Sequence, residues 1–156
     1  MNIRNAQSKD TDRILYLLSQ VLEIHAEIRP DIFISGTTKY THEDLIGLFE
    51  DETRRTYVAV DENDEVLGYA MCELKEYKDS NNIHPHKEIY IDDLCVDSAA
   101  RGQGIGKDLF LYVKEQARIM DCYNITLNVW EGNDTAKAFY DSMGMKPKST
   151  KMEMLA

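Results

Sequence analysis

The chain has 156 residues, 43% of them hydrophobic, which is enough apolar material for the core of one domain spanning residues 1–156. With 18 basic and 28 acidic residues its formal net charge is −10, which disfavours nucleic acid as a partner and mildly favours cationic ones. No apolar run approaches the ~20 residues of a membrane span, and the N-terminus MNIRNAQSKD lacks an apolar signal segment, so we expect a cytoplasmic protein without a membrane partner.

The N-terminal part of the chain predicts a short strand at Asn2–Asn5 and then an amphipathic helix. Apolar residues recur at i, i+3, i+4, i+7 and i+8 from Ile14, a spacing typical of one buried helix face, and Arg29-Pro30 ends the helix. We interpret the following segment, Ile32–Tyr40, as a candidate substrate lid.

A second helix and a hairpin are predicted next. Thr41 and Asp44 resemble a capping box for a helix at about His42–Glu50. The runs Thr56–Val60 and Val66–Leu74 are rich in strand-forming residues and flank an acidic turn, which favours a β-hairpin.

A polar segment, Lys78–His86, follows the hairpin and predicts an exposed loop. His84 and His86 flank a proline there, but no further His or Cys cluster is at hand, so no metal site is expected. Three widely spaced cysteines favour neither a disulfide framework nor a zinc site.

The C-terminal half alternates strands and helices. The predicted elements are a strand at Glu88–Val96, a helix from Gly104 to about Met120, a strand at Ile125–Trp130, a helix at Thr135–Met143 ended by Gly144, and one or two strands in the tail Met145–Leu155.

The most informative motif is the run RGQGIGK at Arg101–Lys107. Gly102, Gly104 and Gly106 have no Cβ, so the backbone can take positive φ and bring consecutive N–H groups close to an anion. The helix that follows adds its positive N-terminus. We therefore predict a phosphate-binding loop.

Two common phosphate loops are excluded by spacing. A P-loop needs glycine at Arg101 and Ser or Thr at Asp108. A dinucleotide fingerprint needs glycine at Lys107, or glycine or alanine at Leu109.

The remaining pattern, Arg-x-x-Gly-x-Gly, resembles the pyrophosphate loop of the GNAT superfamily of acetyl-CoA-dependent N-acetyltransferases. IYIDDLCVD at Ile89–Asp97 resembles the family's central strand, and the segment Asn128–Met145 resembles its second cofactor segment. The resemblance implies an α/β (α+β) fold with a mixed, mostly antiparallel sheet of about six to seven strands and about four helices. It also implies two central strands that splay apart for the pantetheine arm, and pairing of two copies into a homodimer.

The resemblance further implies which residues contact acetyl-CoA, with no metal. The expected contacts are Leu94, Cys95 and Val96 on the central strand, Arg101, Gly102, Gln103, Gly104, Ile105, Gly106 and Lys107 in the loop, and Asn133, Ala136, Lys137 and Tyr140 in the last helix. Cys95 is expected to be buried, and Asn133 is also a candidate N-cap.

Acetyl transfer to a primary amine needs a base and a proton donor. Asp92 and Asp93 are adjacent on a strand and are expected to point to opposite faces of the sheet. Asp92 matches the acidic residue that some family members use as a base, and it is our candidate base. Glu88 is the second candidate. Tyr140 matches the tyrosine that donates a proton to the coenzyme A sulfur in many members.

The leading hypothesis is therefore an enzyme that acetylates an amine of a small molecule or peptide by direct attack in a ternary complex. The alternative is a non-catalytic acyl-CoA-binding module that uses the thioester as a structural or sensory ligand. The segments expected to form the acceptor pocket carry no pattern that identifies the amine.

Overall fold

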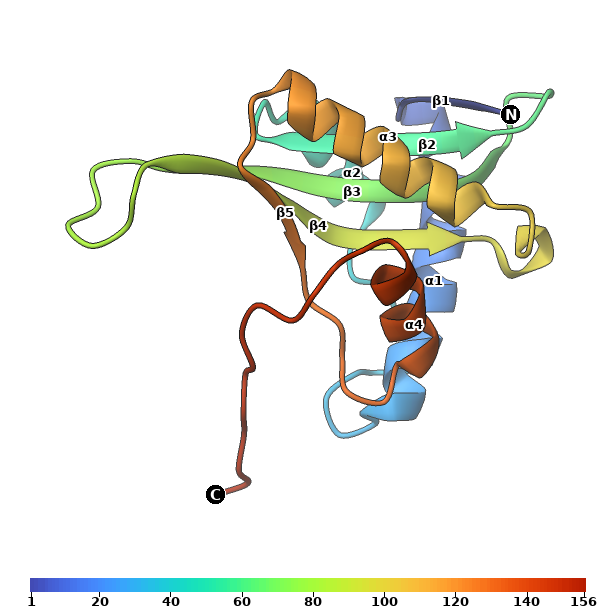
Figure 1. The fold of residues 1–156 in the computed structure, drawn as a ribbon. Helices are drawn as coiled ribbons and strands as arrows, with labels where there is room; N and C mark the ends of the chain where they lie inside the picture. Colours follow the sequence, from blue (N-terminus) through green and yellow to red (C-terminus); the bar gives the residue numbers. More distant parts are fainter.

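A computed structural model describes residues 1–156 and contains one open sheet of five strands with four α-helices (Figure 1). The strands are β1 (Asn2–Asn5), β2 (Arg54–Val60), β3 (Val66–Tyr77), β4 (His86–Val96) and β5 (Asn124–Leu127). The helices are α1 (Thr11–Ile28), α2 (His42–Glu50), α3 (Ile105–Ile119) and α4 (Asp134–Ser142), with short 3-10 turns at Ser8–Asp10 and Ser98–Ala100. None of the helices has the length and hydropathy needed to cross a membrane.

The sheet is mixed, with strand order β1-β2-β3-β4-β5. The first four strands are antiparallel neighbours, and β5 runs parallel to β4 because α3 provides the crossover between them. The pairing of β4 with β5 covers only Glu88–Ile91 and Asn124–Leu127. The rest of β4, as far as Val96, therefore has a strand neighbour only on the β3 side.

The predicted number of six to seven strands is wrong, because the tail forms none. Residues 145–156 are extended but pair with no strand, and Figure 1 shows them running away from the body of the molecule. Pro147 removes a backbone donor early in this segment, and its charged side chains give it no continuous apolar face to bury. The predicted strand at Ile125–Trp130 is also shorter than expected, since β5 ends at Leu127.

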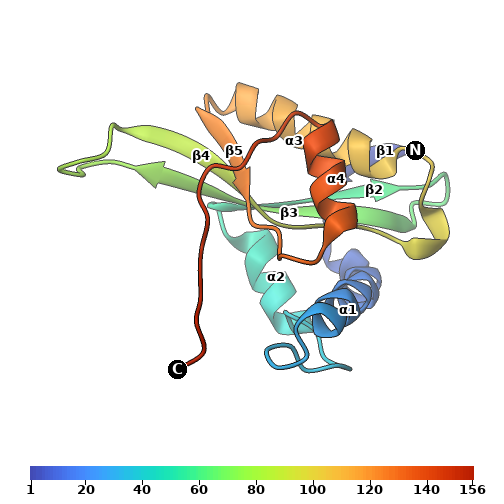
Figure 2. The ribbon, with the colours of Figure 1, turned by 60° about the horizontal axis from the view of Figure 1, so that its bottom comes forward.

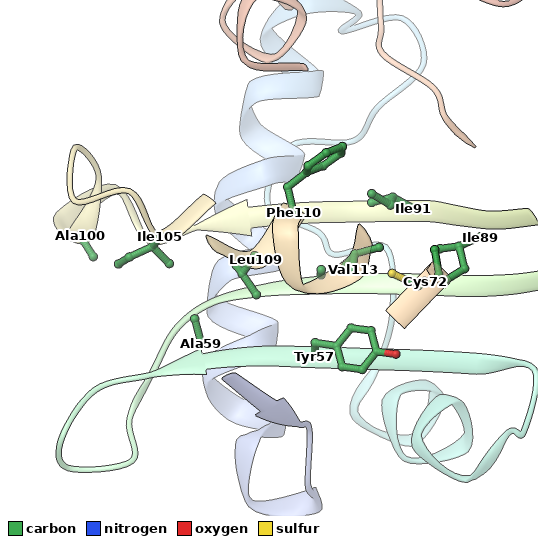
Figure 3. Packing of buried hydrophobic residues seen from close by; sticks show 12 residues of the cluster. Tyr57, Ala59, Cys72, Ile89, Ile91, Ala100, Ile105, Leu109, Phe110 and Val113 are labelled. Atoms are coloured by element: carbon green, nitrogen blue, oxygen red, sulfur yellow. The ribbon is translucent and has the colours of Figure 1, made fainter. Parts of the chain in front are cut away.

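Two apolar clusters fill the two faces of the sheet. On one face the inner side of α3, including Leu109 and Val113, packs over Tyr57, Cys72 and Ile89 (Figure 3). The opposite face is covered by α1 and α2 (Figure 2). The amphipathic spacing that predicted α1 is confirmed, because four of its five apolar positions, Ile14, Leu17, Leu18 and Leu22, are buried and the fifth, Val21, is half-buried.

Candidate active site

The loop between β4 and α3 presents a row of free backbone donors. Gly102 and Gly104 have φ values of +80° and +79°, and Gly104 is the N-cap of α3. None of the amides of residues 101–107 donates to a backbone carbonyl, and Arg101 and Lys107 are exposed at the two ends of the run. Because these N–H groups gather at the positive end of a helix, the loop has the donors and the electrostatics to bind a diphosphate.

The start of this loop is fixed to α1 through Asp97. The Asp97 carboxylate accepts hydrogen bonds from the Ala99 amide at 3.0 Å and from Arg13 Nη2 at 2.7 Å. The Arg13 hydrogen bond is the main cause that holds the pKa of Asp97 below its usual range. Gln20 on α1 also accepts from the Ser98 amide at 3.1 Å. The loop therefore leaves β4 in a fixed direction.

The helix α4 begins as the sequence predicted. The Asn133 side chain accepts from the Ala136 amide at 3.3 Å, which confirms its capping role. Lys137 forms an ion pair with Glu131 at 2.6 Å. The positive φ of Gly144, +91°, ends the helix, and the Met145 amide donates back to the Tyr140 carbonyl.

Tyr140 lies where α4 meets α3. Gly106 in the first turn of α3 faces the Phe139 ring of α4, which lies 3.4 Å from where a Cβ of residue 106 would be, so the two helices pack together here. The Tyr140 ring lies 6.3 Å from that of Phe110. Burial, and secondarily the negative charge of Asp93, raise the pKa of the half-buried Tyr140 hydroxyl above its usual value. This phenol is therefore protonated at neutral pH.

A β-bulge in β4 corrects one prediction. The register pairs Met71 with Asp93 but Cys72 with Ile91, so Asp92 is an extra residue without a partner on β3. The expectation that Asp92 and Asp93 point to opposite faces is wrong, because the extra residue breaks the alternation. Both carboxylates accept hydrogen bonds from tyrosines on the face covered by α1 and α2.

Each of these carboxylates has its own partners. Asp92 accepts from the Tyr40 hydroxyl at 2.6 Å and from Lys39 Nζ at 2.8 Å. Asp93 accepts from the Tyr69 hydroxyl at 2.5 Å. Lys39 and Tyr40 lie in the segment Ile32–Tyr40 that we interpret as a candidate lid, but neither was predicted as a site residue. The sequence carries no signal that joins them to a carboxylate more than 50 positions away.

The other predicted residues of β4 have different environments. Glu88, the reserve base, is buried and accepts a hydrogen bond from Thr126 Oγ1 on β5, so it is engaged in joining the two strands. Cys95 is 5% exposed, which confirms that it is buried. Leu94 and Val96 are half-buried on the stretch of β4 that lacks a β5 neighbour.

Burial also perturbs Asp93. The loss of solvent raises the pKa of this carboxyl to about 6, because the opposing effect of the Tyr69 hydrogen bond is smaller. A carboxyl whose pKa is higher in the folded state holds its proton more tightly there than in the unfolded chain. Its contribution to stability is therefore present at low pH and is lost as the pH rises from about 4 to about 6.

An Asp93→Asn variant should lack this contribution. The free energy of unfolding of the variant minus that of the wild-type chain is therefore expected to increase as the pH rises from 4 to 6. Urea denaturation of both proteins across this range measures the difference. A Tyr69→Phe variant removes the hydrogen bond that lowers the Asp93 pKa, so the pH-dependent loss of stability should extend to higher pH in this protein. The same pH dependence of the free energy of unfolding in all three proteins would contradict the raised pKa of Asp93.

The glycine loop at the N-terminus of α3, the stretch of β4 without a β5 neighbour and Tyr140 on α4 are the features expected of a GNAT-like acetyltransferase fold. The sequence profile of the acetyltransferase (GNAT) family matches residues 18–145. The chain belongs to this family.

Individual relatives agree with this assignment. Glucosamine 6-phosphate N-acetyltransferase of Arabidopsis thaliana is 29% identical over 113 residues, which are 72% of this chain and 66% of that protein. Peptidyl-lysine N-acetyltransferase YjaB of Salmonella typhimurium is 26% identical over 94% of this chain and 83% of its own length. The crystal structure of a mutant BH1408 protein from Bacillus halodurans superimposes with a TM-score of 0.95 at 33% identity, covering 100% of this chain and 99% of that one.

Proposed function

We propose that residues 1–156 form one N-acetyltransferase domain, which transfers acetyl from acetyl-CoA to a primary amine by direct attack in a ternary complex. The observation that carries the proposal is the convergence of three features along β4 and its neighbours. Free amides at residues 101–107 suit the diphosphate, and the unpaired edge of β4 suits the pantetheine arm. Burial, and then the charge of Asp93, which is next to the proposed base Asp92, raise the pKa of Tyr140, and this supports an acyl end between β4 and α4.

The acceptor amine must lose a proton before it attacks. An aliphatic amine with a pKa of about 10.4 is mostly charged at pH 7, and neutralising it costs roughly 4.6 kcal/mol. Asp92 is the proposed base, because its carboxylate already accepts a hydrogen bond from the Lys39 ammonium. Asp93 adds negative charge beside it, which favours binding of a cationic acceptor.

The departing thiolate needs a proton. Tyr140 is the proposed donor, since its raised pKa keeps the hydroxyl protonated until negative charge develops on the sulfur. Backbone N–H groups near Leu94 or Cys95 polarise the thioester carbonyl in this proposal, because the stretch after the bulge has a strand neighbour on one side only.

Relatives point to the class of acceptor. Their names specify glucosamine 6-phosphate and peptidyl-lysine, which both carry a primary amine. The adjacent carboxylates of Asp92 and Asp93 and the net charge of −10 favour an acceptor that carries positive charge and no excess of phosphate. A lysine side chain in a peptide, or a polyamine, fits these charges better than a sugar phosphate.

A coenzyme A release assay tests the proposal. The purified chain is supplied with acetyl-CoA and separately with glucosamine 6-phosphate, a lysine-containing peptide, a polyamine and an aminoglycoside. We expect release above the rate without amine for at least one cationic acceptor, and a large loss of that release in an Asp92→Asn variant. Tight binding of acetyl-CoA without release for any amine would instead support the non-catalytic module.

The proposal includes a homodimer. Each tail is extended and carries apolar side chains in solvent: Met152 is 86% exposed, Met154 93% and Leu155 81%. The outer edge of β5 has no strand neighbour. The tail contains three basic residues, Lys146, Lys148 and Lys151, and one acidic residue, so it is positively charged whereas the whole chain has a net charge of −10. A tail that adds a strand to β5 of a second copy would pair this edge and bury the apolar side chains.

Truncation after Met145 is expected to convert a dimer into a monomer. Light scattering coupled to size-exclusion chromatography measures the mass of the full and the shortened chain. Because the shortened chain keeps every residue of the two apolar clusters that contain the sheet's core, it should stay folded by circular dichroism. A full-length monomer, or a truncated chain that remains a dimer, would contradict this part of the proposal.

A further inference from the structure

Lys39 occupies an unusual position in the candidate active site. Its Nζ donates to Asp92 Oδ1 at 2.8 Å, while the neighbouring Tyr40 hydroxyl donates to Oδ2 at 2.6 Å. Both residues belong to the segment between α1 and α2. The Lys39 ammonium therefore takes the place beside Asp92 that the proposed mechanism gives to the acceptor amine.

The ion pair between Lys39 and Asp92 can break and re-form. The Asp92 side chain is 12% exposed, but that of Lys39 is 49% exposed, and Asp92 is its single ion-pair partner. Solvent screens the exposed Lys39 end of this ion pair and weakens it, so the lysine can leave the carboxylate and return to it. The Lys39 amine thus samples the acceptor position without being fixed there.

Aromatic side chains lie close to the segment that carries Lys39. Burial, and then the charge of Lys39, lower the pKa of His25 on α1, so this imidazole adds no positive charge beside the lysine at neutral pH. The His25 ring packs against Phe33, which meets Trp130 edge to face. Phe33 of the same segment thus has aromatic neighbours, while Asp92 offers Lys39 a carboxylate that can accept a proton.

We propose that Lys39 is a site of self-acetylation, an inference that rests on the proposed function. In the absence of an external amine, Lys39 Nζ gives a proton to Asp92 and attacks the thioester carbon of bound acetyl-CoA. The C–N bond forms and the C–S bond breaks. Of the three ammonium protons, one stays on the amide nitrogen, one is released to solvent through Asp92, and one replaces the proton that Tyr140 gives to the coenzyme A thiolate.

Acetylation changes the site by removing a charge. The acetylated nitrogen keeps one N–H, so the ion pair with Asp92 becomes an ordinary hydrogen bond. The lysine then no longer competes as a cation for the carboxylate.

The test incubates the purified full chain with acetyl-CoA alone and maps acetylated peptides by mass spectrometry over time. Lys39 should be acetylated at least about tenfold faster than Lys9 and Lys78, two exposed lysines that are each paired with a carboxylate elsewhere. The rate should not depend on protein concentration, and Tyr140→Phe and Asp92→Asn variants should slow it. The Lys39→Arg variant should lose the main acetylated species.

Several outcomes would overturn the inference. Equal acetylation of the three lysines, or acetylation that persists unchanged in Tyr140→Phe, indicates chemical reaction with the thioester. No acetylation of Lys39 in a protein that releases coenzyme A with external amines refutes self-acetylation and leaves the proposed function intact. If neither reaction occurs, both proposals fail.

Discussion

A Gly104→Val variant is expected to bind coenzyme A at least about tenfold more weakly than the wild-type chain while remaining folded. Gly104 has a φ of +79° and caps α3, and a Cβ placed there meets no other atom within 4 Å. The substitution therefore acts through backbone strain alone, which costs roughly 1–2 kcal/mol. Relief of that strain rotates the flanking peptide units and turns the amides of residues 101–107 away from the diphosphate.

Isothermal titration calorimetry with coenzyme A measures this loss. Gly36→Val is the matched control, because Gly36 has a φ of +81° and equally open space but lies outside the loop. It should cost similar stability and leave coenzyme A affinity unchanged. Equal affinities in the two folded variants would show that the loop does not bind the diphosphate.

Replacing Tyr140 with phenylalanine is expected to lower kcat by about 10²–10⁴-fold on any accepted amine. The phenol is protonated at neutral pH because its pKa is raised, and phenylalanine keeps the packing against Phe110 and Phe139 while removing the proton. The dissociation constant of acetyl-CoA should change little, since the ring remains in place. Steady-state kinetics and direct binding separate the two effects.

The control for this variant is Tyr123→Phe. Tyr123 is 82% exposed and immediately precedes β5, outside the candidate site. Its kinetics should match those of the wild-type chain. A Tyr140→Phe enzyme with normal kcat would remove the proton-donor role, whereas a loss of acetyl-CoA binding would reassign Tyr140 to cofactor positioning.

Much of the fold could be predicted because its signals are local. The spacing from Ile14 gives α1, the capping box at Thr41 gives α2, and the glycines of the loop give the start of α3. Each depends on residues a few positions apart, so periodicity and capping chemistry are sufficient. The geometry of the glycine loop could be predicted for the same reason, because Gly102 and Gly104 take the positive φ that their lack of a side chain allows.

The tail could not be predicted in this way. A strand is defined by the strand it pairs with, and residues 145–156 pair with no strand of their own chain. The weak alternation of apolar and polar residues around Met152 and Met154 fits an edge strand and an unpaired extended segment equally well. The error in strand number therefore comes from treating a local pattern as if it specified a tertiary partner.

The candidate acceptor site was predicted only in part for a similar reason. Asp92 and Tyr140 match family positions, but a bulge inserts one residue into an otherwise regular strand and reverses the expected direction of Asp93. The hydrogen bonds of Asp92 to Lys39 and Tyr40 span more than 50 positions and arise only when the segment before α2 packs over β4. Sequence spacing carries no information about such contacts.

The crystal structure of the complex with coenzyme A is the most direct test of the account. We expect diphosphate oxygens within about 2.7–3.2 Å of amides in residues 101–107, and the sulfur within hydrogen-bonding reach of the Tyr140 hydroxyl. A diphosphate bound elsewhere, or a sulfur beyond the reach of Tyr140, would contradict it.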